Sequence, residues 1–496
     1  MKILIENLGP IKSFDFDLSK DLNIIYGQNN IGKSYAITAV YLIIKNFLTS
    51  DSSFPYYDYY FFARRGLHYI DNSSDQSKKI RDFITYSKKK ENEFLQKLNK
   101  SSENEIIANE ELKDLFIRLL SFSILPGLER SFDNSFSSLR ELKNQFSNGE
   151  FKITLNYKEF NLSIGISSES KLYISDLLFS KQVYVRKVKG NRKIHRKNGK
   201  IYIYHNISNS NNDTELLINH IMSIFSSLKN EITNLVNNIY FLPASRSGLY
   251  QALSTFSAVI AELSKSRNFL TQKIELPNIS EPVSDYFLYL SNVSKPAKNE
   301  RYNKIGKFVE ESILRGEVKF NFESHKIVFY SPEINSELDL SVTSSMISEI
   351  APIVAFLKFI ISDEHKSDYL LFESSSRSSK KSPANVIFIE EPEAHLHPKI
   401  QVLLMDVFIQ LIECNVKIIM TSHSNYMFNK LSNVILKGEI SPKRVGSYLM
   451  KMTTEGSVID ETSMKADSEG IVDENFANIS EELFNERMKI YEDLNN

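Results

Sequence analysis

The 496-residue sequence contains only one cysteine, Cys414. A single cysteine excludes an internal disulfide and a metal site built from several cysteines, and it suits a reducing cytoplasm. No stretch approaches the ~18 uninterrupted apolar residues of a membrane-spanning helix. The N-terminus, MKILIENLGP, also lacks the long apolar region of a signal peptide. We therefore expect a soluble cytoplasmic protein that makes no contact with membranes.

The chain also lacks an excess of charge of either sign, because its formal net charge is −1. A protein with so little net charge has no general attraction for nucleic acids, so any such contact must come from a local patch. The sequence does have 42% hydrophobic and 24% charged residues, which is typical of a folded globular protein. Its length indicates a core with insertions and not one ordinary domain.

Residues 25–35, IYGQNNIGKSY, match the pattern G-x-x-x-x-G-K-[ST] of a phosphate-binding P-loop. The flanking residues support this interpretation, because 22–26 form a short apolar run typical of a strand and 34–47 have a helical pattern. Backbone N–H groups and a helix N-terminus then surround a triphosphate. Lys33 would bridge the β- and γ-phosphates, and the Ser34 hydroxyl would bind Mg²⁺. We predict an ATP site that includes Gly27, Asn29, Asn30, Gly32, Lys33 and Ser34.

A second motif, which is acidic, indicates the other half of a nucleotide site. Residues 386–389, VIFI, read as a buried parallel strand, and the tetrapeptide EEPE follows them. Because alternate strand residues point to opposite faces, the first two carboxylates cannot do the same work. We assign Glu390 to Mg²⁺ and Glu391 to orienting and activating the attacking water. A further apolar run, 416–420, leads into TSHS, where His423 could contact the γ-phosphate and sense its loss.

Two histidines after the acidic motif, His395 and His397, resemble a metal-binding pair. Zinc sites need further ligands at defined spacings, and the sequence supplies none near this pair. A structural role or a contact at the edge of the nucleotide is therefore favoured for both.

A basic run lies within residues 51–237, which separate the two halves of the predicted site. Residues 80–145 have helical patterns and 150–205 alternate like strands. Residues 181–200 hold nine Lys or Arg and no acid. Such a run is either solvated surface or a finger that contacts nucleic-acid phosphates, since Lys and Arg neutralise phosphate whatever the base sequence. The predicted hairpin tip carries Arg192, Lys193, Arg196 and Lys197.

The motifs GxNNxGKS, EEPEAHLHP and TSHS, in this order, resemble the ABC-type ATPase heads of the SMC/RecF/OLD group. They are similar in particular to the OLD-like ATPases of bacterial anti-phage systems such as Septu, PARIS and Gabija. The matching segments are 1–48, 238–290, 305–361 and 384–445, and EEPEAHLHP is the most specific motif. The resemblance implies an α/β fold, with an ABC-ATPase head of the P-loop NTPase type. In such a head helices flank a mixed sheet, and here an α-helical plus β-hairpin insertion interrupts it.

In this group ATP lies between two heads, with the P-loop of one facing a signature serine of the other. The resemblance therefore implies a homodimer or a higher oligomer, and Ser345 matches the signature serine. The glycine usual at the next position is Met346, whose Cβ limits how closely backbone approaches phosphate. We therefore expect slow hydrolysis or a stable ATP-bound assembly. The segment YFLPASRSG also resembles a recurring part of these ATPases, which implies that Arg246 lines the nucleotide pocket.

Four domains follow from these patterns. We expect residues 1–50 to form the N-terminal part of the head and 51–237 an insertion that is first helical and then β-rich. Residues 238–450 would complete the head, and 451–496 would be an acidic tail. The end of that tail, 474–494, is amphipathic enough for a docking helix, although a solvated tail also fits.

The resemblance implies an ATPase subunit of an anti-phage defence system that binds ATP and Mg²⁺ and controls a separate effector protein, such as a nuclease. Nucleases of the OLD family carry a Toprim domain after the ATPase. Only 73 residues follow His423 here, and they hold no such constellation. The main alternative is a DNA-repair or DNA-end-binding ATPase of the RecF/SMC type. A toxin activity within the insertion remains open, while Met346 and EEPEAHLHP disfavour a transporter ATPase.

Overall fold

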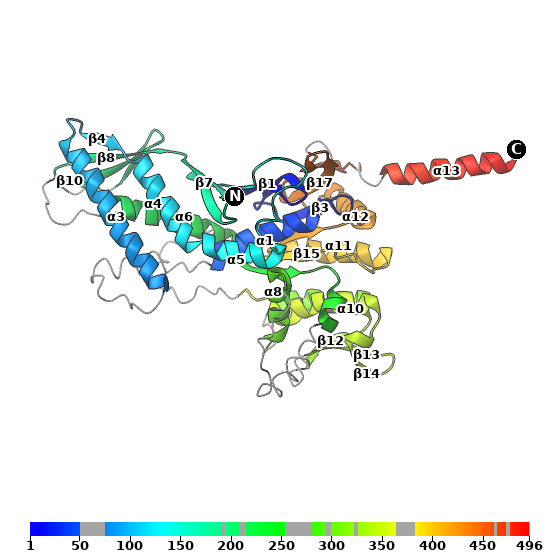
Figure 1. Ribbon diagram of the computed structural model, residues 1–496. Coiled ribbons are helices and arrows are strands. Elements are labelled where there is room, and N and C mark those ends of the chain that lie inside the picture. Colours follow the sequence, from blue (N-terminus) through cyan, green and yellow to red (C-terminus); the bar gives the residue numbers. More distant parts are fainter. Residues whose placement is uncertain are drawn as a thin grey trace, which may run out of the picture. The chain divides into compact units, whose positions relative to one another are not determined.

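The computed structural model describes residues 1–49, 75–190, 192, 194–207, 215–252, 279–293, 299–321, 326–363, 382–460, 464–472 and 477–495. These residues form two compact units (Figure 1). The first unit comprises Met1–Leu8, Leu42–Asn144 and Asn148–Asn234, and the second comprises Gly9–Tyr41, Gln145–Ser147 and Leu235–Asn496. The four domains expected from the sequence remain a prediction.

A mixed sheet forms the centre of the second unit, with the strand order β11-β15-β16-β3-β17-β18-β2. In that order the strands are Val236–Leu242, Ala384–Glu390, Val416–Thr421, Leu22–Tyr26, Val445–Thr453, Gly456–Ile459 and Ile11–Asp17. β3 lies between β16 and β17, is parallel to both, and has no exposed residue. A strand covered on both faces needs apolar side chains throughout, which explains the run LNIIY.

Helices of the second unit cover this sheet. α1 (Lys33–Thr49) starts directly after the P-loop, while α11 (Pro398–Glu413) and α12 (Asn425–Leu436) lie together against the strands (Figure 1). The rings of Tyr26 on β3 and Phe428 on α12 meet edge to face, with 5.7 Å between their centroids. Buried side chains of β3, α11 and α12 belong to one hydrophobic core.

A smaller group of elements precedes β15. It contains α8 (Glu281–Ser291), α9 (Glu300–Val309), the π-helical turn η4 (Glu310–Leu314), β12 (Glu317–Asn321), β13 (Lys326–Ser331), β14 (Ser336–Asp339), η5 (Leu340–Val342), α10 (Ser345–Ala355) and η6 (Phe356–Ile360). The strands β12, β13 and β14 form an antiparallel sheet. After β18, the chain forms the short strands β19 (Ala466–Asp467) and β20 (Gly470–Ile471) and then α13 (Ala477–Asn495).

The first unit contains two sheets and several long helices. The order β1-β5-β6-β7 describes one sheet and β4-β8-β10-β9 the other. The strands are β1 (Lys2–Leu8), β4 (Glu105–Ile107), β5 (Lys152–Asn156), β6 (Phe160–Ile166), β7 (Leu172–Phe179), β8 (Gln182–Val188), β9 (His195–Lys197) and β10 (Lys200–Asn206). The helices are α3 (Asp75–Lys100), α4 (Asn109–Ser123), α5 (Leu125–Phe136) and α6 (Leu216–Leu235).

A buried carboxyl group ties two of these helices together. Glu91 of α3 accepts hydrogen bonds from the backbone N–H groups of Leu216 and Leu217, at the start of α6. The first N–H groups of a helix have no partner within the helix, so this contact satisfies them. Burial raises the pKa of Glu91 to about 8. Glu91 is therefore a structural cap, buried in the first unit.

The predicted α/β fold class is confirmed, since helices flank a large mixed sheet. The basic hairpin differs in its pairing. β9 and β10 form the hairpin around Asn198 and Gly199, whose φ angles of 51° and 73° suit a tight turn. β8, the strand that precedes the predicted tip, is not an arm of this hairpin and instead pairs in parallel with β10. The sheet of the second unit also continues past residue 450, through β17 and β18.

Candidate nucleotide site

The P-loop connects β3 to α1 and needs glycine at both ends. Gly27 and Gly32 have φ angles of 137° and 96°, a region that favours glycine. A Cβ on Gly27 would lie 2.6 Å from the carbonyl oxygen of Met450, and one on Gly32 would lie 2.9 Å from Ile11 Cγ1. Asn30 is also left-handed, at 64°. Any other residue at position 27 or 32 would therefore strain the backbone and collide with neighbouring atoms, so this loop conformation requires glycine.

Lys33 lies at the base of this loop and is buried. Its Nζ donates hydrogen bonds to the carbonyl oxygens of Gly27 and Gln28, at 3.0 and 2.6 Å. Burial lowers the pKa of Lys33 to about 8, against the opposing pull of Glu391 and Glu393. The loop thus holds the Lys33 ammonium group beneath the position where a polyphosphate would bind.

Ser34 and Glu390 approach each other from two elements. The hydroxyl of Ser34 lies in the first turn of α1 and hydrogen-bonds to the carboxylate of Glu390 at the end of β15. Burial raises the pKa of Glu390, and the bond from Ser34 opposes that rise. A hydroxyl beside a carboxylate is a pair of oxygen donors suited to Mg²⁺. The ion would be held by these two residues and would neutralise charge on the phosphate oxygens.

Glu391 leaves the strand in a different direction from Glu390. Its φ of 42° turns the backbone, and its N–H bonds to the carbonyl and hydroxyl oxygens of Thr421, each at 3.2 Å. Its side chain is 43% exposed, and Oε1 lies 3.8 Å from Nε2 of His423. Burial and the charge of Lys33 lower the pKa of His423. A carboxylate and a neutral imidazole therefore lie together at the open side of the site, where they could orient a water molecule.

Glu393 is a site residue whose role sequence reasoning missed. Its buried carboxylate accepts hydrogen bonds from the Ser422 hydroxyl, at 3.0 Å, and from the backbone N–H of His423. Burial raises the pKa of Glu393. The residue fixes the loop that carries His423, and its charge also acts on Lys33. Its place as the third acid of EEPE was the only signal in the sequence.

Arg246 is placed differently from the sequence expectation of a side chain that lines the pocket. It is fully buried, and it forms an ion pair with the equally buried Glu349 at 3.2 Å. Its guanidinium also donates to the carbonyl oxygens of Glu390 and Glu391, at 3.0 and 3.4 Å. Arg246 therefore supports the backbone of the two acidic residues from behind, with no side-chain surface open to a ligand.

The predicted signature residue lies at an exposed helix start. Ser344 is the N-cap of α10, and its hydroxyl accepts the N–H of Ile347 at 3.4 Å. Ser345 is the first residue of the helix and is exposed. The side chain of Met346 packs partly against the hydrophobic core. The structure thus leaves Ser345 accessible to another molecule, while its contact with a second head remains a prediction.

The two histidines after the acidic motif differ in their surroundings. His397 caps α11, because its Nδ1 accepts the N–H of Lys399 at 3.2 Å. His395 is exposed and has a left-handed φ of 59°. No group of three or more His, Cys, Asp or Glu among the described residues could hold a metal ion. The structural role favoured from the sequence fits His397.

Comparison with known families identifies the chain. The profile of the family described as AAA ATPase domain matches residues 1–428. The chain belongs to this family. The predicted ATPase activity is thereby confirmed, whereas the narrower OLD-like assignment stays a prediction. No curated protein matches this ATPase. No helix of its described residues is long and apolar enough to cross a membrane.

Several solved structures resemble this ATPase at low identity. The SMC head domain from Thermotoga maritima is 8% identical and covers 92% of this chain and 97% of its own, with a TM-score of 0.33. An SmcHead bound to the C-winged helix domain of ScpA is 12% identical and covers 92% and 95%, with 0.34. An Smc head domain with an extended coiled coil, bound to the C-terminal domain of ScpA derived from Pyrococcus furiosus, is 11% identical and covers 100% and 99%, with 0.36. With such low TM-scores, these likenesses determine neither a substrate nor a partner.

The pKa of Lys33 leads to a prediction for ATP binding. Without nucleotide Lys33 loses its proton near pH 8, whereas bound phosphates would favour the ammonium form. ATP binding should then take up a proton above pH 8, and the dissociation constant should rise by up to about tenfold per pH unit there. Below pH 8 this contribution should be absent. Calorimetry in buffers of different ionisation enthalpy measures the proton uptake, and equal proton uptake at pH 7 and pH 9 would contradict the assignment.

Proposed function

We propose that this ATPase works as a dimer in which ATP is sandwiched between two heads. One head supplies the P-loop, Glu391 and His423, and the other supplies Ser345. The observation that carries this proposal is the distribution of groups in one chain. Glu391 and His423 lie together near Lys33, while Ser345 lies exposed at the start of a helix. A helix N-terminus attracts anions such as phosphate, so an exposed one suits contact with ATP bound to another copy.

We further propose that the ATP-bound assembly controls a separate effector in an anti-phage defence system. The motif EEPEAHLHP supports this role through its resemblance to OLD-like defence ATPases. The decisive experiment purifies the Glu391→Gln protein with ATP from cells that also express its native neighbouring genes, and then identifies the co-purifying species. A stoichiometric second protein would support the effector. Nucleic acid without a protein partner would instead favour the repair-type ATPase.

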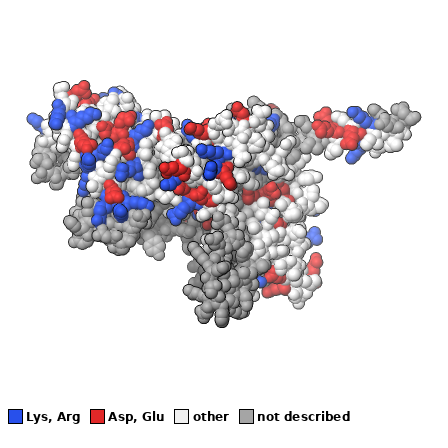
Figure 2. Space-filling model, viewed as in Figure 1, with Lys and Arg blue, Asp and Glu red and all other residues white. Residues whose placement is uncertain are grey.

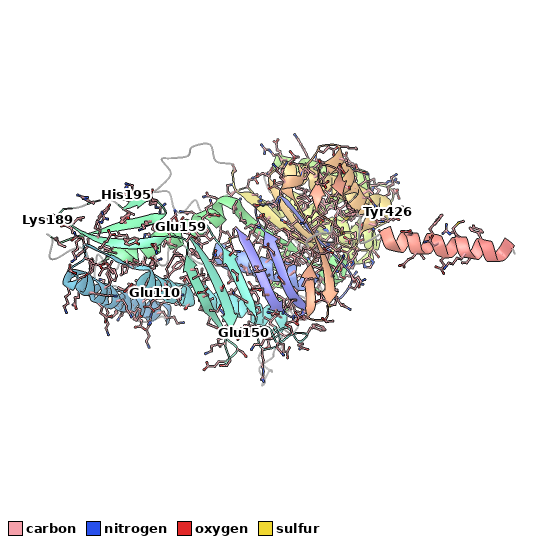
Figure 3. All side chains as sticks on the ribbon, turned by 90° about the horizontal axis from the view of Figure 1, so that it is seen from above. Glu110, Glu150, Glu159, Lys189, His195 and Tyr426 are labelled. Atoms are coloured by element: carbon pink, nitrogen blue, oxygen red, sulfur yellow. The ribbon has the colours of Figure 1, made fainter. Side chains whose placement is uncertain are left out.

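The repair-type alternative is supported by a basic surface of the first unit. Figure 2 shows Lys and Arg side chains over the region of α3 and β10, interspersed with acids. Lys200 lies 4.8 Å from the ring centre of Tyr184, and Arg192 lies 5.9 Å from that of Tyr204. Lys189 and His195 lie in the same region (Figure 3). Sites for single-stranded nucleic acid combine cations with aromatic rings, and this surface offers both kinds of group.

Other contacts weaken this alternative. Arg186 of β8 donates to Glu105 at 2.7 Å, and Arg196 lies 3.8 Å from Glu159. These cations are already partly neutralised. Lys193 lies outside the described residues.

Replacing the four predicted contact residues together tests whether this surface binds DNA. If the unaltered protein binds duplex DNA, the variant with Arg192, Lys193, Arg196 and Lys197 changed to Ser should bind more weakly. The slope of log affinity against log salt should become shallower by about 0.9 for each phosphate that the variant no longer neutralises. Fluorescence anisotropy at several salt concentrations measures both quantities. An unchanged slope would show that these four residues contact no DNA phosphate and are solvated surface.

A further inference from the structure

The sheet β4-β8-β10-β9 of the first unit has two faces of different character. Val183 and Val185 of β8 and Ile201 and Ile203 of β10 are buried on one face. Because alternate strand residues point to opposite sides, the pairing registers place the residues between them together on the other face. That face is partly or fully exposed, and we call it the aromatic-basic face after Tyr184, Arg186, Lys197, Lys200, Tyr202 and Tyr204.

Rings and cations lie in one continuous group on the aromatic-basic face. The rings of Tyr184 and Tyr202 are neighbours across β8 and β10 and stack, with 5.5 Å between their centroids. A cation lies between 4.8 and 5.9 Å from the centre of each of three rings, namely Lys200 at Tyr184, Arg186 at Tyr202 and Arg192 at Tyr204. The face therefore offers aromatic surface and positive charge side by side.

The charge of this face suits a phosphate backbone. Glu105 of β4 is the acid among the described strand residues of the face, and it is occupied by Arg186, whose Nε donates to it at 2.7 Å. Lys197 and Lys200 have no ion-pair partner among the residues that the structure describes, and they face each other across β9 and β10. These two cations are therefore available to neutralise phosphate.

The tyrosine rings favour unpaired bases over a duplex. In a duplex each base is already stacked between its neighbours, whereas an unpaired base can stack on an aromatic side chain. Arg192 and Lys200 reach the rings of Tyr204 and Tyr184 only with the ends of long side chains. A base can take their place over the ring while the cation turns to the adjacent phosphate.

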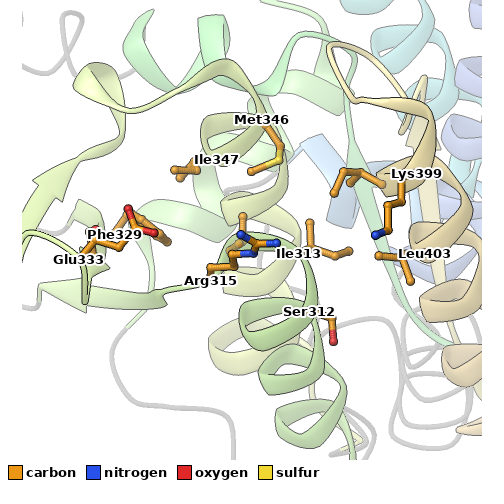
Figure 4. A pocket seen from close by; sticks show the side chains of 12 residues that line it. Ser312, Ile313, Arg315, Phe329, Glu333, Met346, Ile347, Lys399 and Leu403 are labelled. Carbon is orange, nitrogen blue, oxygen red and sulfur yellow. The ribbon is translucent and has the colours of Figure 1, made fainter.

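A pocket of about 360 Å³ in the second unit also has cations at its rim but lacks this combination (Figure 4). Arg315 and Lys399 are exposed there, together with the acid Glu333. Among the described residues that line the pocket, the aromatic one is Phe329, which is buried. The pocket offers no open ring to a base, so the aromatic-basic face is the better site for a nucleic acid.

We propose that the aromatic-basic face binds single-stranded nucleic acid, with bases stacked on Tyr202 and Tyr204 and phosphates held by Lys197 and Lys200. Such binding tolerates any sequence, because every base has a flat aromatic face. DNA and RNA share this chemistry. The inference extends the basic surface described above from phosphate contacts to unpaired bases. It does not depend on the ATP sandwich, because all the residues belong to the first unit.

Binding to oligonucleotides without ATP tests the ligand class. Fluorescence anisotropy compares an oligothymidine, an oligouridine and a duplex of the same length, each at the same salt concentration. We expect at least one single strand to bind about tenfold or more tightly than the duplex, and the preferred strand identifies DNA or RNA as the ligand. Equal or tighter binding of the duplex, or no binding of either strand, would overturn the inference. Because no nucleotide is present, failure of ATP-dependent dimerisation would not affect this result.

Two matched double variants test the stacking itself. Changing Tyr202 and Tyr204 to Phe keeps both rings, whereas changing both to Leu keeps apolar side chains without rings. The Leu variant should bind the single strand at least about fivefold more weakly for each base that loses its ring, and the Phe variant should bind like the unaltered protein. Equal affinity of the two folded variants would overturn the stacking.

Photo-crosslinking of the unaltered protein gives a measurement that needs no variant to fold. A single strand that carries 5-iodouracil is irradiated with the full chain, and the crosslinked peptides are identified by mass spectrometry. We expect crosslinks to peptides that contain Tyr184, Tyr202 or Tyr204. Crosslinks only to other parts of the chain would overturn the inference.

Discussion

Replacing Glu391 by glutamine is expected to lower kcat for ATP hydrolysis by about 10²–10⁴-fold, the usual contribution of a general base. Glutamine keeps the size of the side chain but cannot accept a proton from water. ATP should still bind, because Lys33, Ser34 and the glycine-containing P-loop are unchanged. The ATP-bound dimer should therefore accumulate. Single-turnover hydrolysis measures the chemical step, and titration with a fluorescent ATP analogue measures the binding.

The control for this experiment is a variant that loses a carboxylate outside the candidate site. Glu439 is exposed and lies in the turn after α12, so Glu439→Gln removes a carboxylate without touching the site and should hydrolyse ATP normally. Glu391→Gln with normal turnover would show that Glu391 is not the base. Loss of ATP binding in Glu391→Gln would show instead that the side chain holds the nucleotide.

Replacing Arg246 by methionine should destabilise the protein by about 3–5 kcal/mol, because it leaves the carboxylate of Glu349 buried without a counter-charge. Both side chains of the pair are fully buried. The carbonyl oxygens of Glu390 and Glu391 would also lose their donor. Urea denaturation measures the free energy of unfolding. A small loss of stability together with a large loss of ATP affinity would instead show that Arg246 lines the nucleotide pocket.

The double variant Arg246→Met, Glu349→Gln separates the two parts of this effect. Ser247 donates to the Glu349 carboxylate through its hydroxyl, at 2.9 Å, and a glutamine can still accept that bond. Removing both charges should therefore recover much of the stability lost in Arg246→Met, as expected for residues in one ion pair. A double variant less stable than Arg246→Met would contradict this account of the pair.

The sequence predicted those parts of the site whose residues are neighbours in the chain. Lys33 and Ser34 follow a glycine loop between a strand and a helix, and Glu390 ends an apolar strand, so local pattern sufficed. Parallel strands place their ends at one edge of a sheet, which also brought His423 to the site. Local pattern therefore predicted the main parts of the fold, and it selected most of the residues that the fold brings together in the candidate nucleotide site.

Contacts between distant residues could not be predicted in the same way. Arg246 pairs with Glu349, which lies 103 residues later in the chain. A single arginine in a turn of small residues does not reveal such a buried pair. The N–H bond that Glu393 accepts comes from His423, 30 residues away. The sequence also did not reveal the parallel pairing of β8 with β10. Two alternating runs joined by a turn signal are typical of an antiparallel hairpin, so the pattern favoured the wrong pairing.

The central claim is that each ATP site uses the P-loop of one copy and Ser345 of another. Mixing two inactive variants, Lys33→Ala and Ser345→Arg, tests it most directly. Each should hydrolyse ATP poorly alone. A mixed dimer would contain one site with both changes and one site with neither, so an equimolar mixture should recover about a quarter of the wild-type rate. A mixture with only the average rate of the two variants would contradict the shared site and place hydrolysis within a single head.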